Sequence, residues 1–226
     1  MQEEKIGDRI LYKNNQLIIY NKPAGMPVQA DKTGDQTLQN IIKAFAKKSV
    51  EPVHRIDRPA SGIVLFAKTS GALAALNLQF QNRTIQKTYL AIVKNKPAEA
   101  EGELTHFLLK NQKQNRSVAY EKEIAHSKKA MLKYKLIASS DNYHLLEINL
   151  LSGRHHQIRA QLAAINSPIK GDANMVLKEG ILIGRFIYMR GRFSLTIRFR
   201  GIKRWWLRHY LRILCGSFLQ NNFCND

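Results

Sequence analysis

Segment 54–68 reads HRIDRPASGIVLFAK, a charged loop that leads directly into an apolar run. The apolar residues 63–67 predict a buried strand, so the fold must hold the charged loop at the end of a core element. Asp57 lies between Arg55 and Arg58, and a carboxylate flanked by cations stays ionised and oriented, as a nucleophile or an electrostatic catalyst requires. The same cations suit a phosphate backbone. The segment indicates a reactive carboxylate and a polyanionic substrate, unless Asp57 belongs only to a weak surface salt-bridge cluster.

Charge divides the chain into two parts. The formal net charge is +19, which favours a nucleic-acid partner over a small neutral substrate, although solubility is the simpler alternative. Residues 174–226 hold ten of the 36 Lys and Arg but two of the 17 Asp and Glu, together with both cysteines and both tryptophans. We therefore expect one domain over residues 1–173 and a basic tail over 174–226.

The apolar pattern predicts strands that outnumber helices. A loop rich in proline and glycine follows the first strand, at residues 21–28. Most predicted strands neighbour their sequence partners, which predicts an α+β fold with a mixed, mainly antiparallel sheet flanked by helices. The expected strands are 17–20, 63–67, 88–93, 132–136 and 144–150, and the expected helices are 37–45, one capped by Thr69 or Ser70, and 154–162.

Several classes of protein are excluded by what the sequence lacks. The N-terminus has no apolar signal-peptide core, and no apolar run is long enough to cross a membrane. The first 173 residues contain no cysteine, which argues against a disulfide framework or a thiolate metal site. His54 and His156 could pass for a metal pair, but the sequence suggests no third ligand. We expect a monomeric, cytoplasmic protein without metal, cofactor or membrane contact.

Four segments together resemble the RluA-type pseudouridine synthases. They read NKPAGMPVQ, HRIDRPASGIVLFAK, QKTYLAIV, and SGRHHQIRAQLA followed by SPIKGD. The resemblance runs from about Ile10 to Asp172. It implies a pseudouridine-synthase-like fold and isomerisation of uridine to pseudouridine in rRNA or tRNA, without a cofactor. Many members carry an N-terminal RNA-binding module of the S4 type, and we expect none here because the pattern begins near residue 10.

The resemblance also implies roles for individual residues. Asp57 would be the essential carboxylate, either attacking the uridine or removing a proton, and Arg159 would pair with it. Tyr89 would stack on the base and sit where a proton leaves C5. Taken alone, a tyrosine on a strand such as Tyr89 is more often a core aromatic residue with its hydroxyl at the surface, and an arginine such as Arg159 is most often a helix surface charge. His156 is also a candidate for supporting the loop after Gly153. The predicted RNA-binding and base-flipping residues are Arg55, which would enter the RNA helix, and His54, Arg58, Arg154, His156 and Gln157.

The C-terminal tail departs from the family pattern. Members continue after P-I-x-G-D with segments near K-Y-G, L-H-A-R and F-x-H-P-V, whereas this chain continues ANMVLKEGILIGRFIYMR. Codons permitted for these residues, read in a shifted frame from the Ala173 codon, allow KYG, LHAR and FNHPV in order. We therefore predict that residues from about Asn174 are an out-of-frame translation and that the C-terminal part of the fold is disrupted. A genuine basic RNA-binding tail is the alternative. The alternative function is that of an RNA-binding relative with impaired catalysis.

Overall fold

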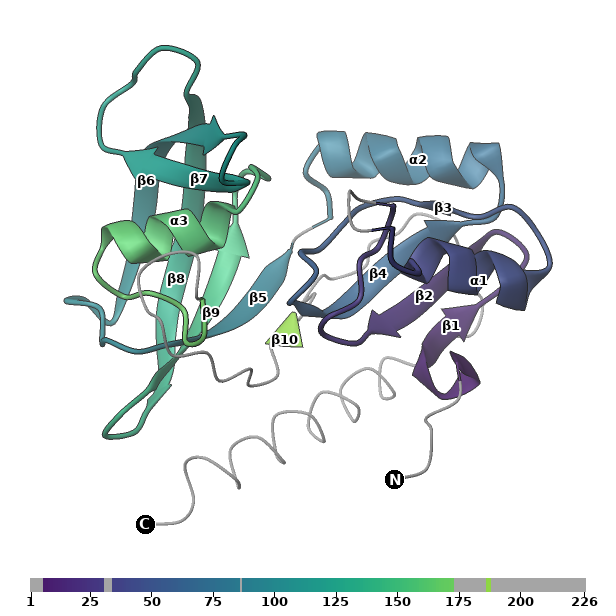
Figure 1. Ribbon diagram of the computed structural model, residues 1–226, viewed down its shortest axis with the longest axis horizontal. Coiled ribbons are helices and arrows are strands. Elements are labelled where there is room, and N and C mark those ends of the chain that lie inside the picture. The colour runs from purple at the N-terminus through teal and green to yellow at the C-terminus, as the bar shows by residue number, and fades with distance from the viewer. Residues whose placement is uncertain (1–5, 31–33, 86, 173–185, 188–226) are drawn as a thin grey trace.

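The computed structural model describes residues 6–30, 34–85, 87–172 and 186–187. Two five-stranded sheets lie next to each other, with helices packed against them (Figure 1). The predicted α+β class is confirmed. The described elements are η1 (Ile6–Arg9), β1 (Ile10–Lys13), β2 (Leu17–Lys22), α1 (Leu38–Ala46), β3 (Glu51–Pro52), β4 (Ser61–Ala67), α2 (Ser70–Gln81), β5 (Thr88–Val93), β6 (Glu101–Asn111), β7 (Arg116–Tyr120), β8 (Lys128–Ser139), β9 (His144–Leu150), α3 (Gln157–Ala164) and β10 (Phe186–Ile187).

The first sheet has the order β1-β2-β4-β10, with β3 also paired to β4. The β1, β2 and β3 pairings are antiparallel, and β10 is parallel to β4, with Phe186 opposite Ser61. The second sheet has the order β5-β9-β8-β6-β7 and is antiparallel throughout. Figure 1 shows β10 beside β4 and close to β5, where the two sheets approach each other. The arrangement is mixed and mainly antiparallel, as the sequence predicts.

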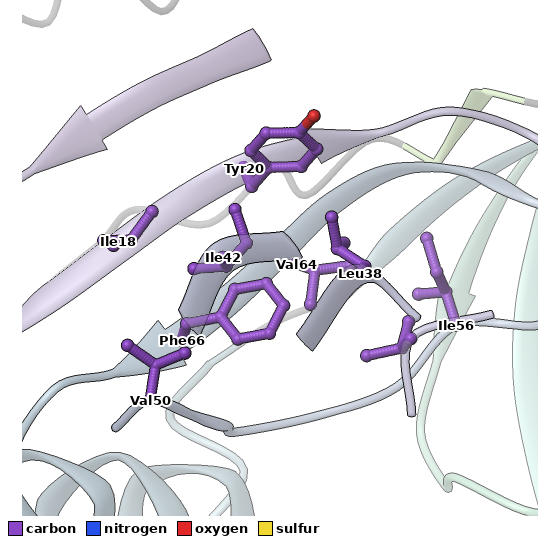
Figure 2. Close-up of a cluster of buried hydrophobic side chains, with 9 residues drawn as sticks. Ile18, Tyr20, Leu38, Ile42, Val50, Ile56, Val64 and Phe66 are labelled. Carbon is purple, nitrogen blue, oxygen red and sulfur yellow. The ribbon is translucent and has the colours of Figure 1, made fainter. Parts of the chain in front are cut away.

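Helix α1 covers one face of the first sheet. The Thr37 side chain accepts a hydrogen bond of 3.2 Å from the backbone N–H of Asn40, which satisfies one of the free donors at the helix start. The helix buries Leu38 and Ile42 completely. Figure 2 shows these two side chains packed in one cluster with others from β2, β4 and the segments on either side of β3: Ile18, Tyr20, Val50, Ile56, Val64 and Phe66.

Helix α2 covers the opposite face of the same sheet. Thr69 caps it by accepting a hydrogen bond from the backbone N–H of Ala72 at 3.2 Å. Leu76 packs against Leu65, whose side chain points away from those of its neighbours Val64 and Phe66 because a strand alternates its faces. The first sheet is therefore covered on both faces, and its loops are fixed by a packed core.

Helix α3 packs on the second sheet and begins later than predicted. Leu162 is fully buried among Leu132 and Ile148, with Ile158 packed beside them. The prediction of a helix from Arg154 is wrong at its start: the helix begins at Gln157, because the preceding residue has left-handed backbone (φ 51°) that interrupts the helix. The segment after Gly153 is therefore a structured loop.

The predicted pattern missed one hairpin, and one predicted segment lies almost entirely outside the described residues. Strands β6 and β7 form a hairpin that the sequence pattern did not predict, because His106 is a polar residue on the buried face of β6 and residues 107–109 are three consecutive apolar residues. The prediction for residues 174–226 lies outside the described residues, apart from β10. None of the helices in the described part is long and apolar enough to span a membrane.

Candidate active site

The loop between β3 and β4 presents Asp57 beside the core. Ile56 points inward and is 8% exposed within the first core cluster, while the Asp57 side chain is 41% exposed. The backbone N–H of Ala60 donates to the carbonyl of Asp57 at 2.9 Å, which closes a turn at this position. The loop is anchored by its apolar residue, and the carboxylate is available to a substrate.

His54 fastens this loop to the protein interior. Its Nε2 accepts a hydrogen bond of 3.3 Å from the backbone N–H of Leu65, and its ring lies 5.2 Å from that of Phe80. Burial, together with the positive charge of Lys87, lowers the pKa of His54 to about 4. The imidazole is neutral near pH 7 and faces inward, a geometry that supports loop anchoring more than the predicted RNA contact.

The two arginines that flank Asp57 have different surroundings. Arg58 forms an ion pair with Asp35, with Nη2 2.7 Å from Oδ2, and its Nε donates to the carbonyl of Gly25 at 2.9 Å. Arg58 therefore ties the loop between β3 and β4 to the loop after β2. Arg55 is exposed directly beside Asp57, where a bound nucleic acid can reach it.

Lys22, at the end of β2, joins the same two loops from inside. Its side chain is fully buried, and Nζ donates to the carbonyls of Pro23 and Met26 at 2.8 Å and of Arg58 at 3.1 Å. Burial lowers the pKa of Lys22 to about 8, although the charge of Asp57 opposes the shift. This lysine lies within NKPAGMPVQ, and no role was predicted for it. Its position between a strand and a proline-containing loop is the feature of the sequence that could have indicated one.

Arg159 projects from α3 and contacts two carboxylates. Its Nε and Nη2 donate to Oδ2 and Oδ1 of Asp172, both at 2.6 Å, and its Nη1 lies 4.0 Å from Oδ2 of Asp57. Burial alone would lower the pKa of Arg159, but the hydrogen bonds and charge of Asp172, together with Asp57, raise it overall. The predicted contact with Asp57 is present but long, and the main partner of Arg159 is Asp172.

A turn that begins beside the far end of β5 holds Asp172. Its backbone N–H donates to the carbonyl of Ile169 at 3.1 Å, and Gly171 has the left-handed backbone (φ 73°) that the turn requires. The backbone N–H of Lys170 donates in turn to the carbonyl of Ile92 on β5 at 2.8 Å. Asp172 lies within SPIKGD, and no role was predicted for it. The residue is 13 positions from Arg159, and only the turn brings the two side chains together.

Tyr89 lies near the start of β5 and packs at the edge of the second core cluster. Burial raises the pKa of its phenol, and the negative charge of Asp57 raises it further. The hydroxyl is therefore protonated at neutral pH and lies within the electrostatic reach of Asp57. The assignment of both residues to one site stays a prediction.

Gln157 is saturated by internal hydrogen bonds. The residue is 3% exposed, and its Oε1 accepts from the hydroxyl of Ser152 at 2.8 Å and from the backbone N–H of Arg154 at 3.0 Å. Its Nε2 donates to the carbonyl of Met131 and to Oε1 of Gln161 at 3.0 and 2.9 Å. These contacts support a structural role for Gln157 rather than the predicted RNA contact.

The remaining predicted residues lie in the loop before α3. Arg154 is exposed, and its Nε donates to the carbonyl of Lys129 at 3.1 Å, so one edge of its guanidinium remains open to solvent. The His156 side chain points toward Asp57 instead, with Nε2 3.8 Å from Oδ2 of that carboxylate. Within the described ranges, no group of three or more His, Cys, Asp or Glu side chains is placed to hold a metal ion.

Comparison with known proteins places this arrangement in a family. A family model described as RNA pseudouridylate synthase matches residues 16–164. The Bacillus subtilis protein named uncharacterized RNA pseudouridine synthase YhcT is 32% identical over 173 residues, which cover 73% of this chain and 56% of that protein. The tRNA pseudouridine synthase C of Pasteurella multocida is 33% identical over 177 residues, which cover 72% of each.

A solved structure supports the fold. The human protein RNA pseudouridylate synthase domain containing 1 superposes with a TM-score of 0.70 at 18% identity, covering 85% of this chain and 82% of that one. The chain spans less than two thirds of several curated relatives, including 56% of the Bacillus subtilis protein and 61% of the ribosomal large subunit pseudouridine synthase C of Rickettsia conorii. The family match, which covers more than half of the sequence, agrees with the resemblance carried by the four segments. The chain belongs to the RNA pseudouridylate synthase family.

Proposed function

We propose that this protein isomerises specific uridines in structured rRNA or tRNA to pseudouridine, with Asp57 as the essential carboxylate. The observation that carries the proposal is the placement of Asp57: its carboxylate is partly exposed and is approached by Arg159 and His156 at 4.0 and 3.8 Å. Family membership supports the reaction, and the names of relatives that act on ribosomal large subunit RNA or tRNA support the class of substrate.

The reaction needs no oxidant or second substrate. The bond between C1′ and N1 of uridine breaks, a bond between C1′ and C5 forms, C5 loses a proton and N1 gains one, so the atoms and electrons balance. The detached base must turn without leaving the site. An ionised carboxylate next to the sugar serves either attack or proton removal, and the neighbouring Arg159 guanidinium stabilises its charge.

The other proposed roles follow from exposure. The target base leaves its stack at a cost of a few kcal/mol, and Arg55 is exposed at the position where it can fill the vacated space. Tyr89 stacks on the flipped base and lies beside C5, where the proton leaves. Arg154, also exposed, contacts a phosphate. The protein acts as a cytoplasmic monomer.

The catalytic domain in this proposal comprises residues 1–173, and residues 174–226 are an out-of-frame segment. The motive is the abrupt change of composition near Asp172, where the family pattern also ends. Resequencing the gene tests this directly: DNA whose alternative frame after codon 173 lacks the K-Y-G and L-H-A-R pattern would refute it.

The function is tested by incubating rRNA and tRNA transcripts with the protein and detecting pseudouridine. Wild-type protein should form it, and Asp57→Asn should form none while binding RNA with nearly unchanged affinity, because the amide keeps the size of the side chain and loses its charge. Tyr89→Phe should react more slowly. Asp57→Asn activity within about tenfold of wild type would exclude the role of Asp57. RNA binding without product from either protein would favour the RNA-binding relative.

A further inference from the structure

His156 is the residue of the site whose role the proposed function leaves open. Its side chain is 11% exposed, and Nε2 lies 3.8 Å from Oδ2 of Asp57. The Arg159 Nη1 atom lies 4.0 Å from the same oxygen. The His156 nitrogen on the loop and the Arg159 nitrogen on α3 therefore lie near the same oxygen of the carboxylate.

The backbone and the neighbouring ring hold the His156 imidazole in place. His156 has left-handed backbone, with φ 51°, and its ring stacks on that of His155 with centroids 3.7 Å apart. His155 is fixed in turn by the hydroxyl of Ser117, which donates to its carbonyl at 2.7 Å and lies 3.1 Å from its Nδ1. Gln157 fixes the loop from the other side through Ser152. The ring is thus positioned before any substrate binds.

The surroundings of the two ring nitrogens select one tautomer. Nδ1 is buried and has no hydrogen-bond partner among the described residues, whereas Nε2 faces the carboxylate. A proton on Nδ1 would leave a buried donor without an acceptor and would turn the Nε2 lone pair toward an anionic oxygen. A proton on Nε2 avoids both costs. Burial also lowers the pKa of His156 to about 4 despite the opposing charge of Asp57, so the ring is neutral at pH 7.

We propose that His156 is a positioning residue whose Nε2–H donates to Oδ2 of Asp57 in the RNA-bound enzyme. With Arg159 on the same oxygen, this contact leaves Oδ1 as the oxygen that faces the ribose and uracil. The 3.8 Å separation is longer than a hydrogen bond, and catalytic contacts of this kind tighten when substrate binds. This proposal rests on the proposed function, because Asp57 must be the reacting group.

The kinetic test compares His156→Gln with His156→Met. Glutamine keeps a neutral N–H donor at similar reach, while methionine has similar length without a donor, and neither is β-branched. The Met variant should lower kcat about 10-fold to 100-fold with KM for the RNA transcript changed less than about twofold, the range expected for one hydrogen bond to a charged group. The Gln variant should recover most of the rate, and both should unfold at the same temperature.

Three results would overturn the proposal. The Met variant could keep the wild-type kcat, Gln could fail to restore the rate, or both variants could lose activity only in proportion to a lowered unfolding temperature. The matched control is His144→Met, because His144 is paired with Val93 at the opposite end of β5 from Tyr89 and should not affect kcat.

An NMR measurement separates this inference from the proposed function. In protein labelled with ¹⁵N-histidine, the resonances lost in His156→Gln identify the His156 ring. At pH 7 that ring should be neutral with its proton on Nε2, and Asp57→Asn should shift the Nε2 resonance. A proton on Nδ1, or no response to Asp57→Asn, would refute the contact even if no transcript yields pseudouridine. A protein that passes this test but forms no pseudouridine would contradict the proposed function and not the geometry.

Discussion

At the scale of single residues, the site is organised by a buried guanidinium with two acidic neighbours. Arg159 has ideal bidentate geometry with Asp172 and a long contact with Asp57. The two carboxylates therefore differ in function: Asp172 is 8% exposed and holds the arginine, and Asp57 is left accessible. This division lets one arginine stay rigid and still lie beside the accessible Asp57 carboxylate.

Removing either partner of the buried pair should destabilise the protein strongly. Arg159→Met leaves the Asp172 carboxylate buried without its partner. Asp172→Asn leaves the Arg159 guanidinium buried without the charge of Asp172. Each change should lower the free energy of unfolding by about 3–5 kcal/mol. The double variant should cost clearly less than the sum, because it leaves no uncompensated charge at this pair. Denaturant unfolding measures all three.

The exposed pair of Lys133 and Glu103 provides the control for this cycle. Their side chains are 59% and 42% exposed and their charged atoms are 3.5 Å apart, so Lys133→Met should cost less than about 1 kcal/mol. If the Arg159 and Asp172 variants are no worse than this surface variant, the buried pair does not support the fold. Purely additive costs in the double variant would show that the two side chains do not depend on each other.

At the scale of the elements, the loop between β3 and β4 that carries Asp57 is fixed at both ends by groups that must keep particular charges. His54 bonds to β4 as a neutral ring, and Lys22 bonds to the loop carbonyl of Arg58 as an ammonium. Ile56 inserts between them into the core cluster (Figure 2). The loop can therefore place Asp57 without help from a ligand, but its stability depends on pH.

Acid should destabilise the protein between about pH 6.5 and pH 4. The unfolded chain takes up protons at His54 and His156 near pH 6.5, whereas burial lowers the pKa of both in the folded state to about 4. Because the unfolded state binds more protons in this window, stability falls as the pH falls, and the full loss is reached below about pH 4. For His54 alone the loss is at most about 3 kcal/mol.

Thermal unfolding across this pH range, with His54→Gln beside wild type, checks the assignment. Glutamine can still accept from the Leu65 N–H but does not titrate, so the variant should lose less stability on acidification. His144→Gln serves as the control, since His144 interacts with Ser139 at the end of β9 away from the loop. Equal acid sensitivity of His54→Gln and wild type would mean that His54 is not the group responsible.

The elements show which parts of the fold sequence patterns can predict. Helix α1 was predictable because Thr37 is a local cap and Leu38 and Ile42 share one helical face. The start of α3 was not, because the left-handed residue His156 is fixed by distant contacts such as that of Ser117 with the neighbouring ring. Hairpin β6–β7 was missed because the polar residue His106 lies on the buried face of β6 and residues 107–109 are consecutively apolar, so the alternation is broken.

The candidate site divides in the same way. Asp57, Tyr89 and Arg159 were predictable because they lie in segments that resemble a known family, and the structure brings them near one another. The contacts of Asp172 and Gln157 were not, because they depend on a turn and on a buried hydrogen-bond network that only the folded chain assembles. The resemblance predicts which residues form the site, but it could not predict which of them face the solvent.

At the scale of the whole molecule, charge and architecture suit a polyanionic partner. The chain has a net charge of +19, and exposed Arg55 lies directly beside the candidate catalytic carboxylate. Another exposed cation, Lys135, lies on β8 with its side chain on the face of the second sheet opposite α3, because its neighbour Tyr134 packs in the core cluster on the α3 side. A substrate bound over Asp57 should therefore contact the first of these cations and not the second.

RNA binding should weaken steeply with salt, and the two cations should affect that dependence differently. The slope in question is that of the logarithm of the association constant against the logarithm of the salt concentration. Neutralising about four to five phosphates gives a slope near −3 to −4, so the affinity for RNA should fall roughly 60-fold to 250-fold between 50 and 200 mM salt. Arg55→Gln should make the slope shallower by about one phosphate contact, while Lys135→Gln should leave it unchanged. Both variants remove the same net charge, so a difference between them reports a local contact rather than the overall field.

Fluorescence anisotropy with a labelled transcript measures the slopes, and a flat salt dependence for wild type would argue against an RNA substrate. Equal slopes for the two variants would place the RNA away from Arg55 and would remove the support for base flipping at Asp57.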